Sequence, residues 1–138
     1  TYGETYVSEM TGKDLLNVLE QVADNLFDPD PYLQSGGDMV RVGGLHYTID
    51  PSKPLYERIT NARLDNGHLI EADQKYKVAG WAQVNRTPEG RLMWDVVRDY
   101  IINNKGKDNV LKLDKINHPE LVNVASNPGI ADYPGKAS

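Results

Sequence analysis

The sequence has no cysteine, which excludes disulfide bonds, thiolate metal sites and a cysteine nucleophile. It also has no run near the ~20 apolar residues that a membrane-spanning helix needs. Its 15 basic residues are scattered among 20 acidic ones, so the net charge is −5 and no basic patch for a nucleic acid stands out. With 39% hydrophobic and 25% charged residues in 138, the composition is that of one globular domain.

Apolar spacing predicts two amphipathic helices. The first follows the Thr11–Asp14 turn and ends at Asp28–Pro31, because each proline disfavours the helical conformation in the residue before it. The second runs from Leu92 to about Asn103 and Asn104. The apolar positions that define them are Leu15, Val18, Leu19, Val22 and Leu26 in the first, and Met93, Val96, Val97, Tyr100 and Ile101 in the second.

Short extended segments separate these helices. Strands are expected at 1–10, 39–42, 45–49, 57–64 and 76–84, with a hairpin turn at Asp65–His68 and a return strand at 69–70. The expected fold is therefore α+β, a single domain with a mixed β-sheet of short strands packed with two main helices. Residues 1–104 would form the core and 105–138 a wrapping, partly mobile tail, in which only 110–113 and 121–124 look able to pack. The opening Thr1 suggests a fragment of a longer protein.

The residue types that usually carry catalysis occur here without the spacing that catalysis needs. His46, His68 and His118 lack metal-ligand spacing, and no serine lies in a G-x-S-x-G elbow. The acidic pairs Asp28/Asp30 and Asp65/Glu71 are typical of turns and solvated surfaces. We therefore expect no catalytic residue and no metal ligand in this chain.

A glycine-rich loop is the most suggestive feature. Gly36, Gly37, Asp38 and Arg41 place bare backbone, a carboxylate and a guanidinium within six residues, which suits an oxyanion such as sulfate or phosphate. The alternative is a loop with an Asp–Arg surface pair. A nucleotide P-loop is disfavoured, because no Lys-Ser/Thr follows and no helix opens there. Trp81 and Trp94 are expected in the core, although Trp81 could instead line a pocket.

Several runs resemble the C-terminal domain of the 5′-nucleotidase family, over roughly residues 1–102. Ser8–Gln21 resembles its first helix, and Gly36–Leu45 its glycine loop and following strand. Tyr47 with Asp50–Pro54 resembles its Y-D-P-S-K-P turn, and Lys75–Ala79 a later strand. These segments occur in the family's order.

Other runs resemble the thiosulfohydrolase (SoxB) branch of this family: Val22–Tyr32, Gly36–Gly44, Val78–Ala82 and Ser126–Ile130. In the nucleotidases the glycine loop carries a base-stacking Phe, where this sequence has Met39. Asn85–Gly90 stands where the family's second stacking aromatic is expected. The resemblance therefore favours the thiosulfohydrolase branch over nucleotide hydrolysis.

The resemblance implies a substrate-contacting C-terminal domain of a periplasmic hydrolase. Its catalytic residues and two manganese ions would lie in an N-terminal metallophosphatase domain that this chain lacks, so the chain alone would be inactive and without cofactor. The expected partners are that domain and the SoxYZ carrier, whose cysteine adduct would lose its sulfonate as sulfate; neither nucleic acid nor membrane is expected. The substrate-contacting residues would be Gly36, Gly37, Asp38, Met39, Arg41 and Trp81. The alternatives are a nucleotidase or nucleotide-sugar hydrolase domain, or a non-enzymatic docking module.

Overall fold

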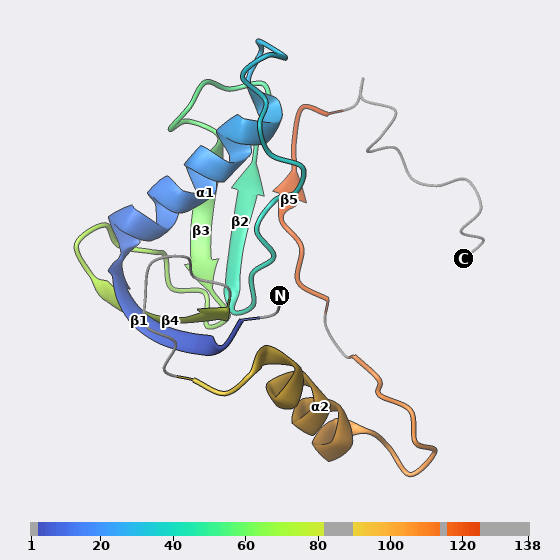
Figure 1. Ribbon diagram of the computed structural model, residues 1–138. Helices are drawn as coiled ribbons and strands as arrows, with labels where there is room; N and C mark the ends of the chain where they lie inside the picture. The colour runs from blue at the N-terminus through green and yellow to red at the C-terminus, as the bar shows by residue number, and fades with distance from the viewer. Residues whose placement is uncertain (1–2, 82–89, 114–115, 125–138) are drawn as a thin grey trace. The chain divides into compact units, whose positions relative to one another are not determined.

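A computed structural model describes residues 3–81, 90–113 and 116–124 of the chain. The chain divides into two compact units, each made of separated stretches of sequence. The first unit comprises residues 1–11 and 75–116, and the second comprises 12–74 and 117–138. Helices and short strands occur in the α+β arrangement that the sequence predicts (Figure 1).

Helix α1, Gly12–Phe27, opens the second unit. Its first N–H groups, which no helix can pair internally, donate to the neighbouring loop: Gly12 N–H to Gln74 O at 2.9 Å and Lys13 N–H to Ala72 O at 3.0 Å. A Cβ on Gly12 would lie 2.1 Å from Glu71 O, so only glycine permits this close approach. The helix ends before Asp28-Pro29, as the sequence predicts.

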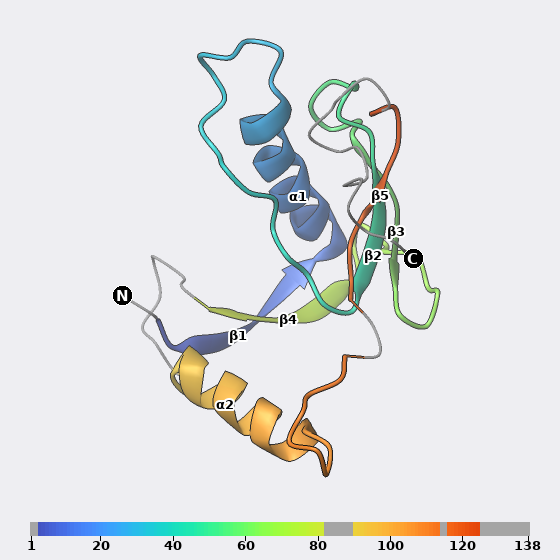
Figure 2. The same cartoon turned by 90° about the vertical axis from the view of Figure 1, so that its right-hand side faces the viewer.

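Strands β2 (Leu45–Ile49), β3 (Ile59–Leu64) and β5 (Glu120–Leu121) form a mixed sheet in the order β3-β2-β5. β3 is antiparallel to β2, whereas β5 is parallel to it. Helix α1 covers one face of this sheet in both views (Figures 1 and 2). The buried core between them consists of Leu19, Ala23, Tyr47, Ile49 and Ala62.

A charged network holds the segment before β3 against α1. The carboxylate of Glu20, only 4% exposed, accepts the Tyr56 N–H at 3.0 Å and the Ile59 N–H at 2.6 Å. The guanidinium of Arg58, 2% exposed, donates to Asp24 Oδ1 at 2.6 Å. Since a buried charge needs such partners, these contacts fix where β3 begins.

The turn at 65–68 joins β3 to residues 69–70 as predicted. The Leu64 N–H donates to His68 O and the Ile70 N–H to Ala62 O, both at 2.9 Å, and Gly67 has a φ of +85°. Among the described residues, the return segment forms one isolated bridge, Leu69 with Arg63, rather than a strand.

The strand predicted at 39–42 is wrong. Residues 39–42 form no strand and pair with none of the described strands; instead Met39 and Val42 pack on the core.

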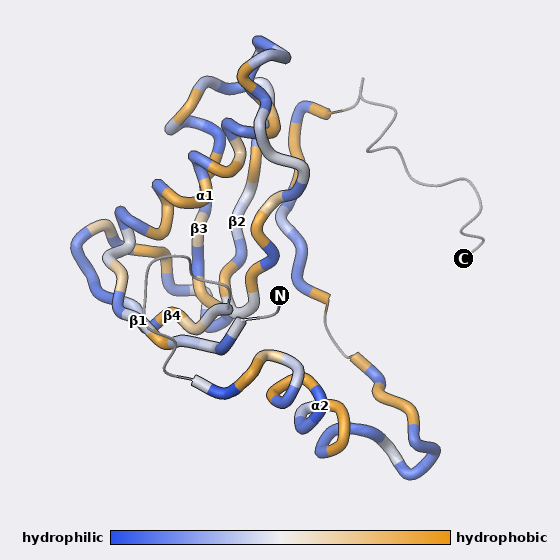
Figure 3. The backbone as a smooth tube through the Cα atoms, in the orientation of Figure 1, coloured by the Kyte–Doolittle hydropathy of each residue, from blue (hydrophilic) through white to orange (hydrophobic). Residues whose placement is uncertain are grey.

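The first unit contains β1 (Thr5–Thr11), β4 (Lys75–Trp81) and α2 (Met93–Asn104). β1 and β4 pair antiparallel as a separate two-stranded sheet. Gly90 approaches the strand so closely that a Cβ there would lie 1.9 Å from Thr5 O, and the Thr5 N–H donates to Arg91 O at 2.8 Å. Hydrophobic and hydrophilic residues alternate along α2, as along α1 (Figure 3), but none of the α2 residues is buried.

Most of the predicted loop at 85–90, and the tail from 125 onward with its Ser126–Ile130 run, lie outside the described residues. Within the described part of the predicted tail, Leu121 belongs to β5, which makes residues 120–121 part of the sheet of the second unit. Among the described residues, no helix is long and apolar enough to cross a membrane.

Candidate functional site

The beginning of the glycine loop, defined here as residues 35–44, is hydrogen-bonded to Asn25 near the end of α1. The Gly36 N–H donates to Asn25 O at 3.2 Å, and the Ser35 hydroxyl donates to Asn25 Oδ1 at 3.1 Å. A Cβ on Gly36 would lie 3.0 Å from Asn25 Cβ, so the loop can approach the helix because this residue is glycine. The Gly36 N–H is therefore used inside the protein, whereas the Gly37 N–H has no partner among the described residues.

Two side chains of the glycine loop anchor it to the core. Met39 and Val42 are partly buried and pack against the core of the second unit. Val40 and Arg41 between them are exposed. Because Met39 packs against the core, its partly buried side chain anchors this part of the loop.

Asp38 and Arg41 form an ion pair on the outside of the glycine loop. Arg41 Nη2 lies 3.1 Å from Asp38 Oδ2, and the two side chains are 89% and 77% exposed. Such an exposed pair contributes little to stability, about 0–1 kcal/mol. The guanidinium keeps other N–H groups available, and Asp38 orients it, so the pair is able to contact an anion from solvent.

The carboxylate of Asp50 stabilises the turn after β2 by accepting hydrogen bonds. Its Oδ1 accepts the Ser52 hydroxyl at 2.6 Å and the Ser52 N–H at 3.0 Å, and its Oδ2 accepts the Asn123 amide at 2.6 Å. The Ser52 hydroxyl first, and then the Asn123 amide and the Ser52 N–H, lower the pKa of Asp50. Nearby Tyr47 lies in the core, where burial raises the pKa of its hydroxyl.

Trp81 lies at the end of β4 in the first unit, whereas the glycine loop belongs to the second unit. It is 52% exposed, and Trp94 on α2 is 49% exposed, so neither has the buried position expected of a core residue. The role of Trp81 in contacting substrate stays a prediction, as do those of the other loop residues.

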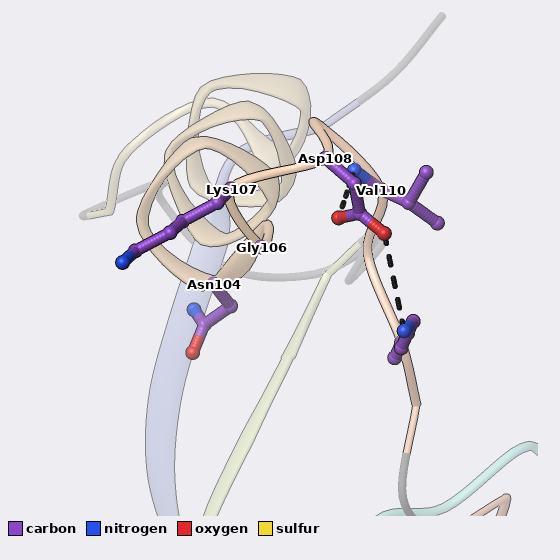
Figure 4. Close-up of a pocket in the computed structure, with 6 residues that line it drawn as sticks. Asn104, Gly106, Lys107, Asp108 and Val110 are labelled. Atoms are coloured by element: carbon purple, nitrogen blue, oxygen red, sulfur yellow. Dashed lines mark hydrogen bonds and ion pairs between the residues drawn. The ribbon is translucent and has the colours of Figure 1, made fainter.

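The histidines and the hollow near the end of α2 offer less chemistry. His46 Nε2 lies 2.5 Å from Asp65 Oδ1 on the surface of the β2–β3 hairpin. In the described part of the chain, no group of three or more His, Asp or Glu could hold a metal ion. An open hollow of about 410 Å³ follows α2 (Figure 4), lined by Asn104, Gly106, Lys107, Asp108, Val110 and Lys112. Within it, Lys112 Nζ lies 3.9 Å from Asp108 Oδ2 as an exposed ion pair.

Sequence reasoning missed the residues that position the glycine loop. Asn25 holds the beginning of the loop, and Asn117 donates to the backbone at its other end. Asn25 lies on a predicted helix, where its spacing could have marked it as a loop contact. Asn117 carries no local signal, because its partners lie 72 and 75 residues earlier.

Comparisons with known proteins agree with this architecture. The family model for the C-terminal domain of 5′-nucleotidases matches residues 2–87, whereas no curated protein matches the chain. This chain is similar to the structure of the sulfate thiohydrolase SoxB of Thermus thermophilus in complex with glycerol. The sequence identity is 26%, the TM-score is 0.73, and the match covers 88% of this chain. A putative 5′-nucleotidase of Staphylococcus aureus, in complex with alpha-ketoglutarate, shares the fold at 16% identity and a TM-score of 0.61 over 86% of the chain.

The matched region equals only 23% and 27% of those two proteins, so the chain spans about a quarter of their length. The family model, in contrast, covers more than half of this chain. The chain therefore belongs to the family of 5′-nucleotidase C-terminal domains, which occurs in hydrolases.

Proposed function

We propose that this chain is the substrate-contacting C-terminal domain of a SoxB-type thiosulfohydrolase. The substrate would be a sulfonate-terminated sulfur adduct on the cysteine of the SoxYZ carrier, in the periplasm. In the hydrolysis, a water oxygen bonds to the sulfonate sulfur and the sulfur–sulfur bond breaks. The bonding electron pair stays with the carrier sulfur, which takes up one proton of the water, and the sulfonate leaves as sulfate with the second proton released to solvent.

The observation that carries this proposal is the orientation of the glycine loop. Met39 packs inward on the core, residues 35–44 include no aromatic ring on which a nucleobase could stack, and Arg41 is exposed. A guanidinium suits a terminal sulfonate because its fork of N–H donors matches the oxygens of an oxyanion. The similarity to SoxB, at a higher TM-score than to the nucleotidase, points the same way.

In the proposal, Arg41 and the Gly37 N–H bind the sulfonate, and Asp38 orients Arg41. The proposal assigns two manganese ions, which would polarise the sulfonate and activate water, to a metallophosphatase domain outside this sequence. Trp81 would line the path by which the carrier reaches that centre.

The test is Arg41→Ala in the full-length protein loaded with manganese, with sulfate release from sulfonated SoxYZ as the assay. Loss of one charge-assisted contact of about 1.5–3 kcal/mol should lower kcat/KM by about 10- to 150-fold. Arg63→Ala is the matched control, because Arg63 is another exposed arginine of the same unit and bonds only to the Asn61 carbonyl among the described residues. Equal turnover in the two variants would refute the anion contact.

A further inference from the structure

The end of the glycine loop is held by one side chain from the far end of the sequence. The side-chain NH₂ of Asn117 donates to Val42 O at 2.6 Å and to Leu45 O at 2.8 Å. These two carbonyls flank the Gly43-Gly44 pair, and Gly44 has a φ of +77°. A carboxamide has two N–H hydrogens, so this one group satisfies both carbonyls at once.

The neighbouring tail residues form a short strand that brings Asn117 to this place. β5 pairs parallel with β2, Thr48 with Glu120 and Ile49 with Leu121, and the Thr48 hydroxyl donates to Glu120 Oε2 at 3.1 Å. In Figure 2, β5 runs beside β2, as it does in Figure 1. Residues 120–121 are thus part of the same sheet as β2, the strand that follows the glycine loop.

Residue 117 lies outside the stretch matched by the family model, which ends at residue 87. The glycine loop lies inside that stretch. The hydrogen bonds that hold the end of the glycine loop therefore come from a residue beyond the stretch that the family model matches.

We propose that Asn117 is a positioning residue, which fixes the end of the glycine loop and thereby presents Arg41 and Asp38 to the anion. This inference rests on the proposed function, because it gives the loop a ligand. Asn117 acts through the backbone: Val42 is held both by this hydrogen bond and by its packing on the core, and Arg41 is the next residue before it. Without the bond, the segment around Arg41 would move more freely.

The variant is Asn117→Asp in the full-length protein, which keeps the side-chain shape but places an oxygen against two carbonyl oxygens. Asn123→Asp is the matched control, since it makes the same exchange in the same tail but disturbs the Asp50 contact instead. The first readout is native trypsin cleavage of the Arg41–Val42 bond. Cleavage that follows local opening should become about tenfold faster in Asn117→Asp and less than twofold faster in Asn123→Asp.

The second readout is kinetic, with sulfonated SoxYZ as substrate. Asn117→Asp should raise KM about tenfold and leave kcat within about twofold, because it removes binding shared by the ground and transition states. In an Arg41→Ala background, the same exchange should change KM by less than about twofold, since the residue acts through Arg41. A merely structural role would give the same loss in both backgrounds.

Equal cleavage rates in wild type and Asn117→Asp would overturn the inference. A KM effect that persists in the Arg41→Ala background would also overturn it. If the wild-type protein releases no sulfate, the proposed function fails and the substrate role of Asn117 fails with it. The cleavage rates then still decide whether Asn117 fixes the loop, so the two failures are distinguishable.

Discussion

The buried carboxylate of Glu20 offers a sharp test of how the second unit is held together. Its two oxygens accept the N–H groups of Tyr56, which precedes β3, and of Ile59, the first residue of β3, at 3.0 and 2.6 Å. Tyr56 is also held at a φ of +71°, which is uncommon for a large side chain. Glu20→Gln keeps the shape and one acceptor oxygen, but turns an NH₂ group toward one of these N–H groups.

The cost follows from the geometry. One buried donor loses its partner, which costs about 1–3 kcal/mol in the free energy of unfolding. A domain of this size has a total stability of about 5–15 kcal/mol. With a urea m-value of about 1.5 kcal/mol per molar, the unfolding midpoint should fall by about 0.7–2 M.

The assay is urea unfolding followed by far-UV circular dichroism, with hydrogen exchange of the Tyr56 and Ile59 amides as a local probe. Gln21→Ala is the matched control, because Gln21 is the next residue of α1 and is exposed. The control should change stability by less than about 0.5 kcal/mol. Equal midpoints for Glu20→Gln and Gln21→Ala, with unchanged exchange at the two amides, would refute the reasoning.

Two further predictions follow from contacts around the glycine loop and the Asp50 turn. Since hydrogen bonds lower the pKa of Asp50 in the folded state, its stabilising contribution is present above its ordinary value of 3.8 and is lost as the pH falls through the lower folded value. Asp50→Asn should therefore reduce the loss of stability between pH 7 and pH 3, measured as urea midpoints, and an unchanged loss would contradict the assignment. Gly36→Ala should weaken the contact with Asn25 by about 0.5–1.5 kcal/mol, whereas Gly37→Ala, which meets nothing within 4 Å, should be neutral in the same unfolding assay; equal effects would count against the close approach.

The helices and the hairpin could be predicted from the sequence because their signals are local. Apolar spacing and the Asp28-Pro29 break locate α1, which ends at Phe27, and the Asp-Asn-Gly-His turn locates the end of β3. The family was likewise carried by local runs, such as the glycine loop and the Y-D-P-S-K-P turn.

The strand predicted at 39–42 fails for a reason that no local pattern reveals. An apolar run with β-favouring residues becomes a strand only when it pairs with a neighbouring strand, and residues 39–42 pair with none of the described strands. Residues 120–121, about 70 residues later in the chain, pair with β2 on the side away from β3. Met39 and Val42 pack on the core without belonging to a strand.

The chemistry of the candidate site was only partly predictable. The Asp38–Arg41 pair follows from a spacing of three residues, and the structure places the two side chains together. The hydrogen bond from the Gly36 N–H to Asn25 O, which makes this N–H unavailable to a ligand, could not be predicted. It depends on how the loop returns to the helix. Nor could the contacts of Asn117, which join residues far apart in sequence.

The central claim is that this domain serves sulfonate rather than nucleotide hydrolysis. The most direct measurement uses the full-length protein loaded with manganese, and follows sulfate release from sulfonated SoxYZ beside phosphate release from AMP. The account predicts sulfate release without phosphate release. Phosphate release without sulfate release would contradict it in favour of a nucleotidase, and release of neither product would contradict it in favour of a docking module.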